Sequence, residues 1–124
     1  MLLLSPQSVI WMASDPVDFR KGIEGLMAIV RQKFCKDPYD GAIFLFYNKL
    51  RTTIKIITFD GQGCWLCMKR LSTGKFQKTT LHKNPTSALI QSLDYRSLYI
   101  LMNNGDPKLA SCSKNWRSPA ITPP

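Results

Sequence analysis

The chain has 124 residues, 44% hydrophobic and 10% aromatic, which fits one folded domain and excludes a disordered chain. Seventeen Lys and Arg oppose eight Asp and Glu, and the net charge of +9 favours an anionic partner: nucleic acid, a membrane surface or an acidic protein. No apolar run approaches the roughly 18 residues of a membrane-spanning helix, and the start MLLLSP lacks the basic region of a secretory signal, so we expect a cytoplasmic protein with reduced thiols.

The first forty residues predict a short strand and then one amphipathic helix. Residues 9–13 form an apolar run that ends at Ser14-Asp15-Pro16, as expected for a strand. Asp18 is the expected N-cap of the helix. Apolar residues then recur at helical spacing on one face: Phe19, Ile23, Leu26, Val30 and Phe34. The helix should end before Asp37-Pro38, because a residue that precedes proline avoids the helical region.

The stretch 41–76 predicts a three-stranded antiparallel meander. Its runs are rich in apolar, aromatic and β-branched residues and are separated by polar or glycine-containing loops, which are hairpin signals. The expected strands are 43–47, 52–59 and 64–71.

The rest of the chain predicts shorter elements. Residues 77–84 are expected to form a mobile loop, residues 85–93 a short helix, and residues 98–102 a helix or a strand. We therefore expect an α+β fold in one domain over residues 1–107: an N-terminal strand, one amphipathic helix, the antiparallel meander and short C-terminal helical segments. Residues 108–124 are expected to be a partly disordered tail.

Basic residues concentrate in the meander and just after it. Between Asn48 and Lys83 there are eight, and the only acid is Asp60. Several stand at hairpin ends, around the aromatic residues Tyr47, Trp65 and Phe76. Two more are expected in the first turn of the helix, where free N–H groups and the helix dipole favour an anion. The candidate nucleic-acid-binding residues are Arg20, Lys21, Lys49, Arg51, Lys69, Arg70, Lys75 and Lys78.

Contacts from such residues to phosphates would give binding that depends on salt and selects weakly for sequence. A solvated basic surface without a nucleic-acid partner is the plainer interpretation of the same charges.

The sequence gives no positive sign of catalysis. Cys64 and Cys67 have C-x-x-C spacing, but they stand in a predicted strand, where residues three apart point to opposite faces. His82 is the only histidine and lies in a polar stretch. The carboxylate pairs Asp15/Asp18 and Asp37/Asp40 are explained by turns and helix caps. We expect no catalytic residue, no metal site and no cofactor, and a small nuclease or metal enzyme is the least favoured alternative.

Residues 16–26, PVDFRKGIEGL, resemble the signature D-[MF]-R-K-G-[FI]-[DE]-G-L of one protein family. It consists of the small accessory proteins encoded by the second reading frame of IS66-type bacterial insertion sequences, often called TnpB. Further similar segments follow in order at 37–46, 60–63, 65–76, 98–107 and 115–117. The sequence departs from the family pattern at residues 77–80, QKTT, where a tryptophan–proline patch is common.

The resemblance implies a non-catalytic accessory role in DNA transposition, beside a separate transposase that carries the catalytic carboxylates. With the charge pattern, it predicts electrostatic binding to the DNA of the insertion-sequence ends. The expected partners are that DNA and the element transposase, and no membrane. The alternative is a protein-interaction module that bridges or regulates the transposase without touching DNA. The sequence does not distinguish DNA from RNA or give the oligomeric state.

Overall fold

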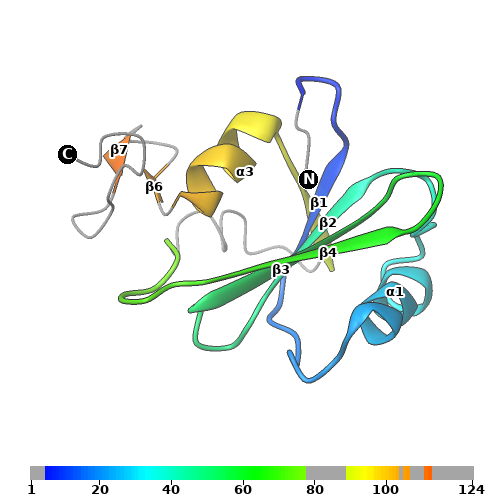
Figure 1. The fold of residues 1–124 in the computed structure, drawn as a ribbon, viewed down its shortest axis with the longest axis horizontal. Helices are drawn as coiled ribbons and strands as arrows, with labels where there is room; N and C mark the ends of the chain where they lie inside the picture. The colour runs from blue at the N-terminus through cyan, green and yellow to red at the C-terminus, as the bar shows by residue number, and fades with distance from the viewer. Residues whose placement is uncertain (1–4, 78–88, 104, 107–110, 113–124) are drawn as a thin grey trace.

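The computed structural model describes residues 5–77, 89–103, 105–106 and 111–112 (Figure 1). The rest of the predicted loop after Gln77, with Lys78 and His82, and most of the tail lie outside these residues. The elements are β1 (Ile10–Ala13), α1 (Ile23–Gln32), β2 (Ile43–Tyr47), β3 (Thr53–Phe59), β4 (Cys64–Arg70), β5 (Ile90–Leu93), α3 (Tyr95–Met102), β6 (Gly105–Asp106) and β7 (Ser111–Cys112). In the described part of the chain, no helix is long and apolar enough to cross a membrane.

Five strands form one mixed sheet in the order β4-β3-β2-β1-β5. The predicted meander is confirmed, because β2, β3 and β4 pair antiparallel in succession. The predicted N-terminal strand is also confirmed, and it joins the same sheet, parallel to β2 and antiparallel to β5. Parallel neighbours need a crossover connection, and here α1 provides it. The fold is therefore α+β, while β6 and β7 pair separately.

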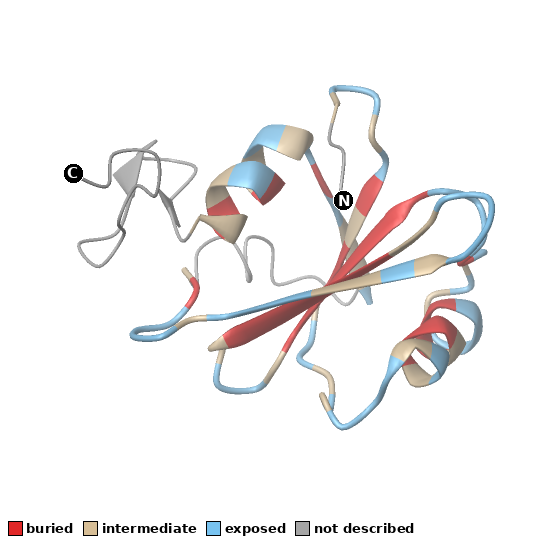
Figure 2. Ribbon diagram, viewed as in Figure 1, coloured by how far each residue is buried: buried red, intermediate tan, exposed pale blue. Residues whose placement is uncertain are grey.

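One helix covers each face of the sheet (Figure 1). Leu45 of β2 packs in the cluster that contains Leu98 and Leu101 of α3, whereas Phe44 and Phe46 pack in the cluster of α1. β2 is consequently buried along its whole length (Figure 2). Burial of each such side chain contributes about 1.5–3 kcal/mol, so this central strand anchors both layers.

The predicted helix over 85–93 is wrong in its described part. Residues Ile90–Leu93 form β5, which pairs with β1 so that Ile10 lies opposite Leu93. Leu93 joins the core on the α3 side, and this long-range pairing overrides the local pattern. Residues 98–102, which the sequence allows as helix or strand, belong to α3. Its N-cap Asp94 accepts a hydrogen bond from the Ser97 N–H (2.9 Å).

Helix α1 begins later than the sequence predicts. Its first residue is Ile23, and its N-cap is Gly22, which offers no side-chain acceptor. The predicted N-cap Asp18 instead accepts a hydrogen bond from the backbone N–H of Arg20 (2.9 Å) in a separate turn. Arg20 and Lys21 therefore precede the helix and do not form its first turn.

Candidate functional site

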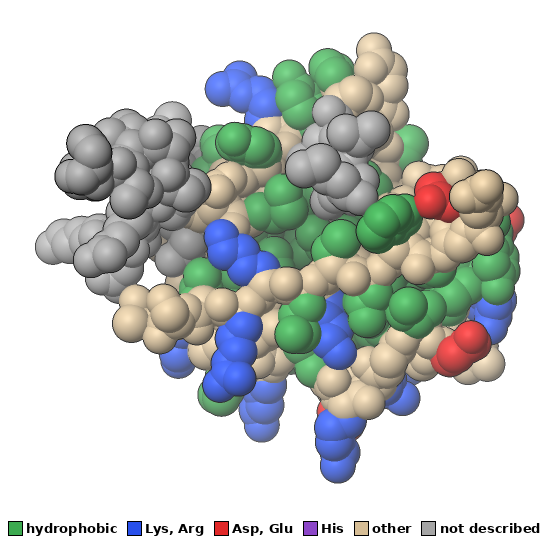
Figure 3. All heavy atoms as spheres, in the orientation of Figure 1, with side chains coloured by type: hydrophobic (Ala, Val, Ile, Leu, Met, Phe, Trp, Pro, Cys, Tyr) green, Lys and Arg blue, Asp and Glu red, His purple; other side chains and the backbone are tan. Residues whose placement is uncertain are grey.

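Most of the candidate basic residues gather at one end of the sheet. β1, β2 and β4 end there and β3 begins there, so the loops after β1, between β2 and β3, and after β4 adjoin. Backbone hydrogen bonds join two of these loops, from the Leu71 N–H to Thr52 O (2.9 Å) and from the Phe76 N–H to Arg51 O (2.8 Å). Lys and Arg side chains line the lower edge of the molecule in Figure 3. We give the name basic rim to the six candidate residues that the three loops and the end of β4 carry: Arg20, Lys21, Lys49, Arg51, Arg70 and Lys75.

Two residues of the sheet fix the loop after β1. Lys55 is only 8% exposed, and its ammonium donates hydrogen bonds to the carbonyl oxygens of Phe19 (3.0 Å) and Lys21 (3.2 Å). The Tyr47 hydroxyl donates to the Ser14 carbonyl (2.5 Å), and burial raises the pKa of Tyr47 to about 12, so this donor keeps its proton. A hydrogen bond from a charged donor contributes about 1.5–3 kcal/mol. Lys55 therefore positions the backbone that carries the first two rim residues.

Sequence reasoning missed this role of Lys55 and counted it only as one more charge. The available signal is weak: a lone lysine stands between Ile54 and Ile56 in a strand whose neighbours are apolar. Lys55 pairs with Phe46 of β2, so its side chain lies on the face of the sheet that α1 covers. Only the fold shows that carbonyl oxygens of the preceding loop lie within reach.

Arg20 is the rim residue whose charge is already paired. Its Nη2 lies 2.7 Å from Oδ2 of Asp18, and its Nε donates to both carboxylate oxygens. These contacts, the hydrogen bond from the Arg20 side chain first, lower the pKa of Asp18 to about 2. The carboxylate is therefore ionised at neutral pH. The Arg20 side chain is 91% exposed. It can therefore bind an external anion, either while it stays paired with Asp18 or after that ion pair breaks.

Lys21 lies against the first turn of α1. A Cβ on Gly25 would come within 2.8 Å of the Lys21 Cβ, so only glycine lets the lysine stem pack across that turn undisturbed. No side chain caps the turn, because the N-cap is Gly22. Helix N-termini favour anions, and Lys21 adds a positive charge beside this one.

Asn48 organises the loop that presents Lys49 and Arg51. Its side-chain oxygen accepts hydrogen bonds from the N–H groups of Thr52 (2.9 Å) and Thr53 (3.1 Å). Arg51 adopts a left-handed conformation with φ of 59° to close the turn. Lys49 is exposed and Arg51 is half-buried. The loop therefore holds its two cations in a defined arrangement.

Two predicted binding residues do not belong to the rim. The Lys69 ammonium donates to the carbonyl of Met102, at the C-terminal end of α3, where a cation is stabilising. Lys78 lies outside the described residues. Of the aromatic residues predicted around these charges, Tyr47 and Phe76 do lie at the rim end of the sheet, but their side chains are buried in the core.

The turn between β3 and β4 lies at the opposite end of the sheet. Asp60 Oδ1 accepts hydrogen bonds from the N–H groups of Gln62 and Gly63 (2.9 Å each), and Oδ2 accepts one from the Trp65 indole (2.7 Å). These bonds, the one from Gly63 first, lower the pKa of Asp60. Trp65 is 46% exposed, and Asp60 holds its ring in one orientation, away from the rim.

Cys64 and Cys67 lie on opposite faces of β4, as predicted. Cys64 packs against the α1-side cluster, and Cys67 packs against the α3-side cluster. Burial raises the pKa of the Cys64 thiol. Within residues 5–77 and 89–103, no three His, Cys, Asp or Glu side chains come together as metal ligands would.

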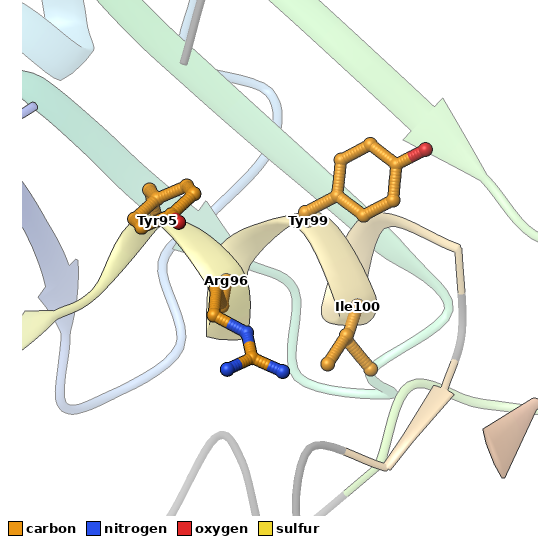
Figure 4. A pocket seen from close by; sticks show the side chains of 4 residues that line it. All are labelled: Tyr95, Arg96, Tyr99 and Ile100. Carbon is orange, nitrogen blue, oxygen red and sulfur yellow. The ribbon is translucent and has the colours of Figure 1, made fainter. Parts of the chain in front are cut away.

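A shallow hollow of about 370 Å³ lies on the outer side of α3 (Figure 4). Tyr95, Arg96, Tyr99 and Ile100 line it. Figure 4 shows the two tyrosine rings on one side of the helix, and Arg96 and Ile100 on the other. None of the rim residues lines this hollow, and sequence reasoning did not single it out.

Comparison with known proteins identifies the family. The model of the IS66 Orf2-like protein family matches residues 8–108. The chain is 40% identical over 93 residues to "Uncharacterized protein y4jC" of Sinorhizobium fredii (strain NBRC 101917 / NGR234), covering 69% of this chain and 80% of that protein. It is 37% identical over 76 residues to "Uncharacterized protein y4hO" of the same strain, covering 60% and 66% respectively. No solved structure matches. The chain belongs to the IS66 Orf2-like family, the accessory proteins of IS66-type insertion sequences.

Proposed function

We propose that the protein acts in transposition as a non-catalytic accessory that binds the DNA of the insertion-sequence ends through the basic rim. It works in the cytoplasm, beside the separate transposase of the element. The observation that carries this function is the convergence of six basic residues, five from three loops and one from the end of β4, on one end of the sheet.

The rim has a size that suits a duplex. It extends across four strands, or about 14 Å at about 4.8 Å per strand spacing. The major groove of B-DNA is about 12 Å wide, so cations at the two sides of the rim can meet the phosphates that border one groove. The described rim is built from loops and the end of β4, with no helix that could enter a groove, so we expect its cations to contact phosphates and not base edges. Binding should therefore select weakly for sequence.

Charge reversal in the rim tests this function. The triple variant Lys49→Glu, Arg70→Glu and Lys75→Glu replaces three exposed cations, two in loops and one at the end of β4. It should lower the affinity for a duplex of the element end at least about 100-fold at low salt, because log K depends on the number of neutralised phosphates. Fluorescence anisotropy with a labelled duplex measures the loss.

A matched control separates position from net charge. The variant Arg31→Glu, Lys33→Glu and Arg96→Glu makes the same change of net charge at exposed sites outside the rim. It should retain affinity within about tenfold, because charges beyond about 10 Å are screened at 0.1 M salt. Equal losses in the two variants would show that the rim is not the contact surface.

One observation favours a second function, in which the rim meets an acidic surface of the transposase. Leu50 is 62% exposed at the tip of the β2–β3 loop, between two cations. An exposed apolar side chain amid charges suits a protein interface better than a phosphate backbone. Retention of the transposase on the immobilised chain in high salt, after nuclease treatment, and its loss in Leu50→Asp would favour this alternative.

A further inference from the structure

β4 is the longer open edge of the sheet. It stands last in the strand order, and no described residue pairs with its outer side. It has seven residues, against four in the other edge strand, β5. Residues 64–68 carry no charge, and Trp65 and Met68 (63%) are exposed. Figure 2 shows β4 as the least buried long strand. An edge of this kind pairs readily with another strand, because its outer N–H and C=O groups lack a partner within the sheet.

The hairpin geometry identifies the peptide groups at this edge. The Asp60 N–H donates to Gly63 O (3.1 Å), and the Leu71 N–H donates to Thr52 O (2.9 Å). In an antiparallel ladder the bonded pairs alternate, so odd-numbered residues of β4 bond to β3. The peptide groups of the even-numbered residues point to the outer edge: Cys64, Leu66, Met68 and Arg70.

We propose that two copies of this chain pair antiparallel through the outer edge of β4. Hydrogen bonds form where outward-pointing residues of the two strands meet. The register that uses all seven residues places Leu66 opposite Met68 of the second copy. Cys67 then lies on the two-fold axis, opposite Cys67 of the second copy, in a non-hydrogen-bonded pair.

A second copy fits this edge because the strand is complementary to itself. In this register the apolar centres of the two strands meet. Lys69 lies opposite Trp65 of the second copy, on the α3 face of both sheets. The indole N–H of Trp65 donates a hydrogen bond to the Asp60 carboxylate, so that carboxylate lies beside the ring. An aromatic ring beside a carboxylate favours a cation. Registers that place Lys69 or Arg70 opposite itself bring like charges together and are disfavoured.

This pairing determines where the two rims lie. A two-fold axis perpendicular to the sheet keeps both α1 helices on one face and both α3 helices on the other. It also carries the two basic rims to opposite ends of the joined sheet. On the basis of the proposed function, the dimer then holds two DNA segments at once.

Cross-linking tests the register. In a background with Cys35→Ser and Cys112→Ser, oxidation by copper phenanthroline in air should join two chains through Cys67. The Cα atoms of a non-hydrogen-bonded antiparallel pair are about 4.5 Å apart, which a disulfide can span. Adding Cys67→Ser should abolish the cross-link, whereas adding Cys64→Ser should preserve it. A cross-link that needs Cys64, or none with Cys67 present, would overturn the register.

Sedimentation of the full chain tests the pairing itself. Met68→Pro removes an outward N–H but no hydrogen bond to β3, whereas Met68→Ala keeps that N–H. The wild type and Met68→Ala should dimerise, and Met68→Pro should associate at least about tenfold more weakly. Circular dichroism should show the same fold in all three. A monomeric wild type, or a proline variant that dimerises equally well, would overturn the pairing.

DNA bridging separates this dimer from the proposed function. The wild type should hold a labelled duplex on beads that carry a second duplex, and Met68→Pro should bind a single duplex without bridging. The double variant Lys49→Glu and Lys75→Glu, which leaves β4 unchanged, should lose most of the DNA binding and still dimerise. Dimers that never bind DNA would refute the function alone, and monomers that bind DNA would refute the dimer alone.

Discussion

The loops at the two ends of the sheet are held by similar hydrogen bonds from backbone N–H groups to one side chain. Their charged residues differ, because the cations at one end are exposed whereas the carboxylate at the other is hydrogen-bonded within its own turn. Asn48 fixes the β2–β3 loop and Asp60 fixes the β3–β4 turn, each by accepting backbone N–H groups. Asn48 is neutral, and the cations beside it remain available at the surface. The charge of Asp60 is engaged within the turn and by Trp65. A count of charged residues therefore does not locate a binding surface, because some charges serve the fold.

The same contrast divides the lysines of the meander region. Lys55 and Lys69 donate to backbone carbonyls and hold the β1–α1 loop and α3 in place. Lys49 and Lys75 are exposed at the rim. We expect substitutions in the first pair to change stability and those in the second to change anion binding.

The largest effect is expected from Lys55→Met. The change leaves the carbonyls of Phe19 and Lys21 without their donor in a buried site, and should reduce the free energy of unfolding by about 2 to 4 kcal/mol. Urea denaturation measures this loss. Lys49→Met is the control and should change the free energy of unfolding by less than about 0.5 kcal/mol. Equal stabilities would contradict the positioning role of Lys55.

Lys69→Met should have a smaller effect on stability. Loss of the cation at the C-terminal end of α3 should cost about 0.3 to 1 kcal/mol in the same denaturation experiment. The slope of log K for DNA against log salt should not change. Lys75→Met should do the reverse, with unchanged stability and a slope that is shallower by about 0.9. A shallower slope in Lys69→Met would place Lys69 on the DNA-binding surface.

Asp18→Asn should strengthen DNA binding. The amide oxygen can still accept from the Arg20 N–H, but the charge that pairs with Arg20 is gone. The salt slope should steepen by about 0.9, as one more cation becomes available. Asp37→Asn, at a similar turn outside the rim, is the control. Because the pKa of Asp18 is about 2, wild-type binding should show no transition from this carboxyl between pH 5 and 8.

The smallest effect is expected at the opposite end of the sheet. Asp60→Asn puts an amide in place of the oxygen that accepts from Trp65, so the indole should become more mobile and its fluorescence anisotropy should fall. The lowered pKa of Asp60 stabilises the fold above the ordinary carboxyl pKa, and this contribution is lost as pH falls through the lowered value. If the fluorescence anisotropy of Trp65 and the decrease of stability at low pH were both unchanged, the hydrogen bond would not be what holds the ring.

Local patterns in the sequence predicted most of the sheet. The boundaries of β2 agree, and β1, β3 and β4 differ from prediction by one residue at an end. These strands have apolar, β-branched residues between clear turn signals. β5 was not predictable in this way, because only its pairing with β1 makes residues 90–93 a strand. Asp18 had the features of an N-cap, but its carboxylate is engaged by Arg20.

The candidate site was predictable in part. The sequence shows that the hairpin ends carry basic residues. The strand order and directions then bring three loops to one end of the sheet. The sequence does not show which lysines are engaged, because their acceptors lie far along the chain. Lys69 and its acceptor Met102 are 33 residues apart, and Lys55 and the Phe19 carbonyl are 36 apart.

The salt dependence of DNA binding tests the role of the rim most directly. We would titrate wild-type protein against an element-end duplex and an unrelated duplex over a range of salt concentrations. With Arg20 paired to Asp18, five rim cations remain, and the slope of log K against log salt should be about −4.5 for both duplexes. A slope near zero, or no binding at low salt, would contradict a DNA-binding rim and favour the acidic surface of the transposase as its partner.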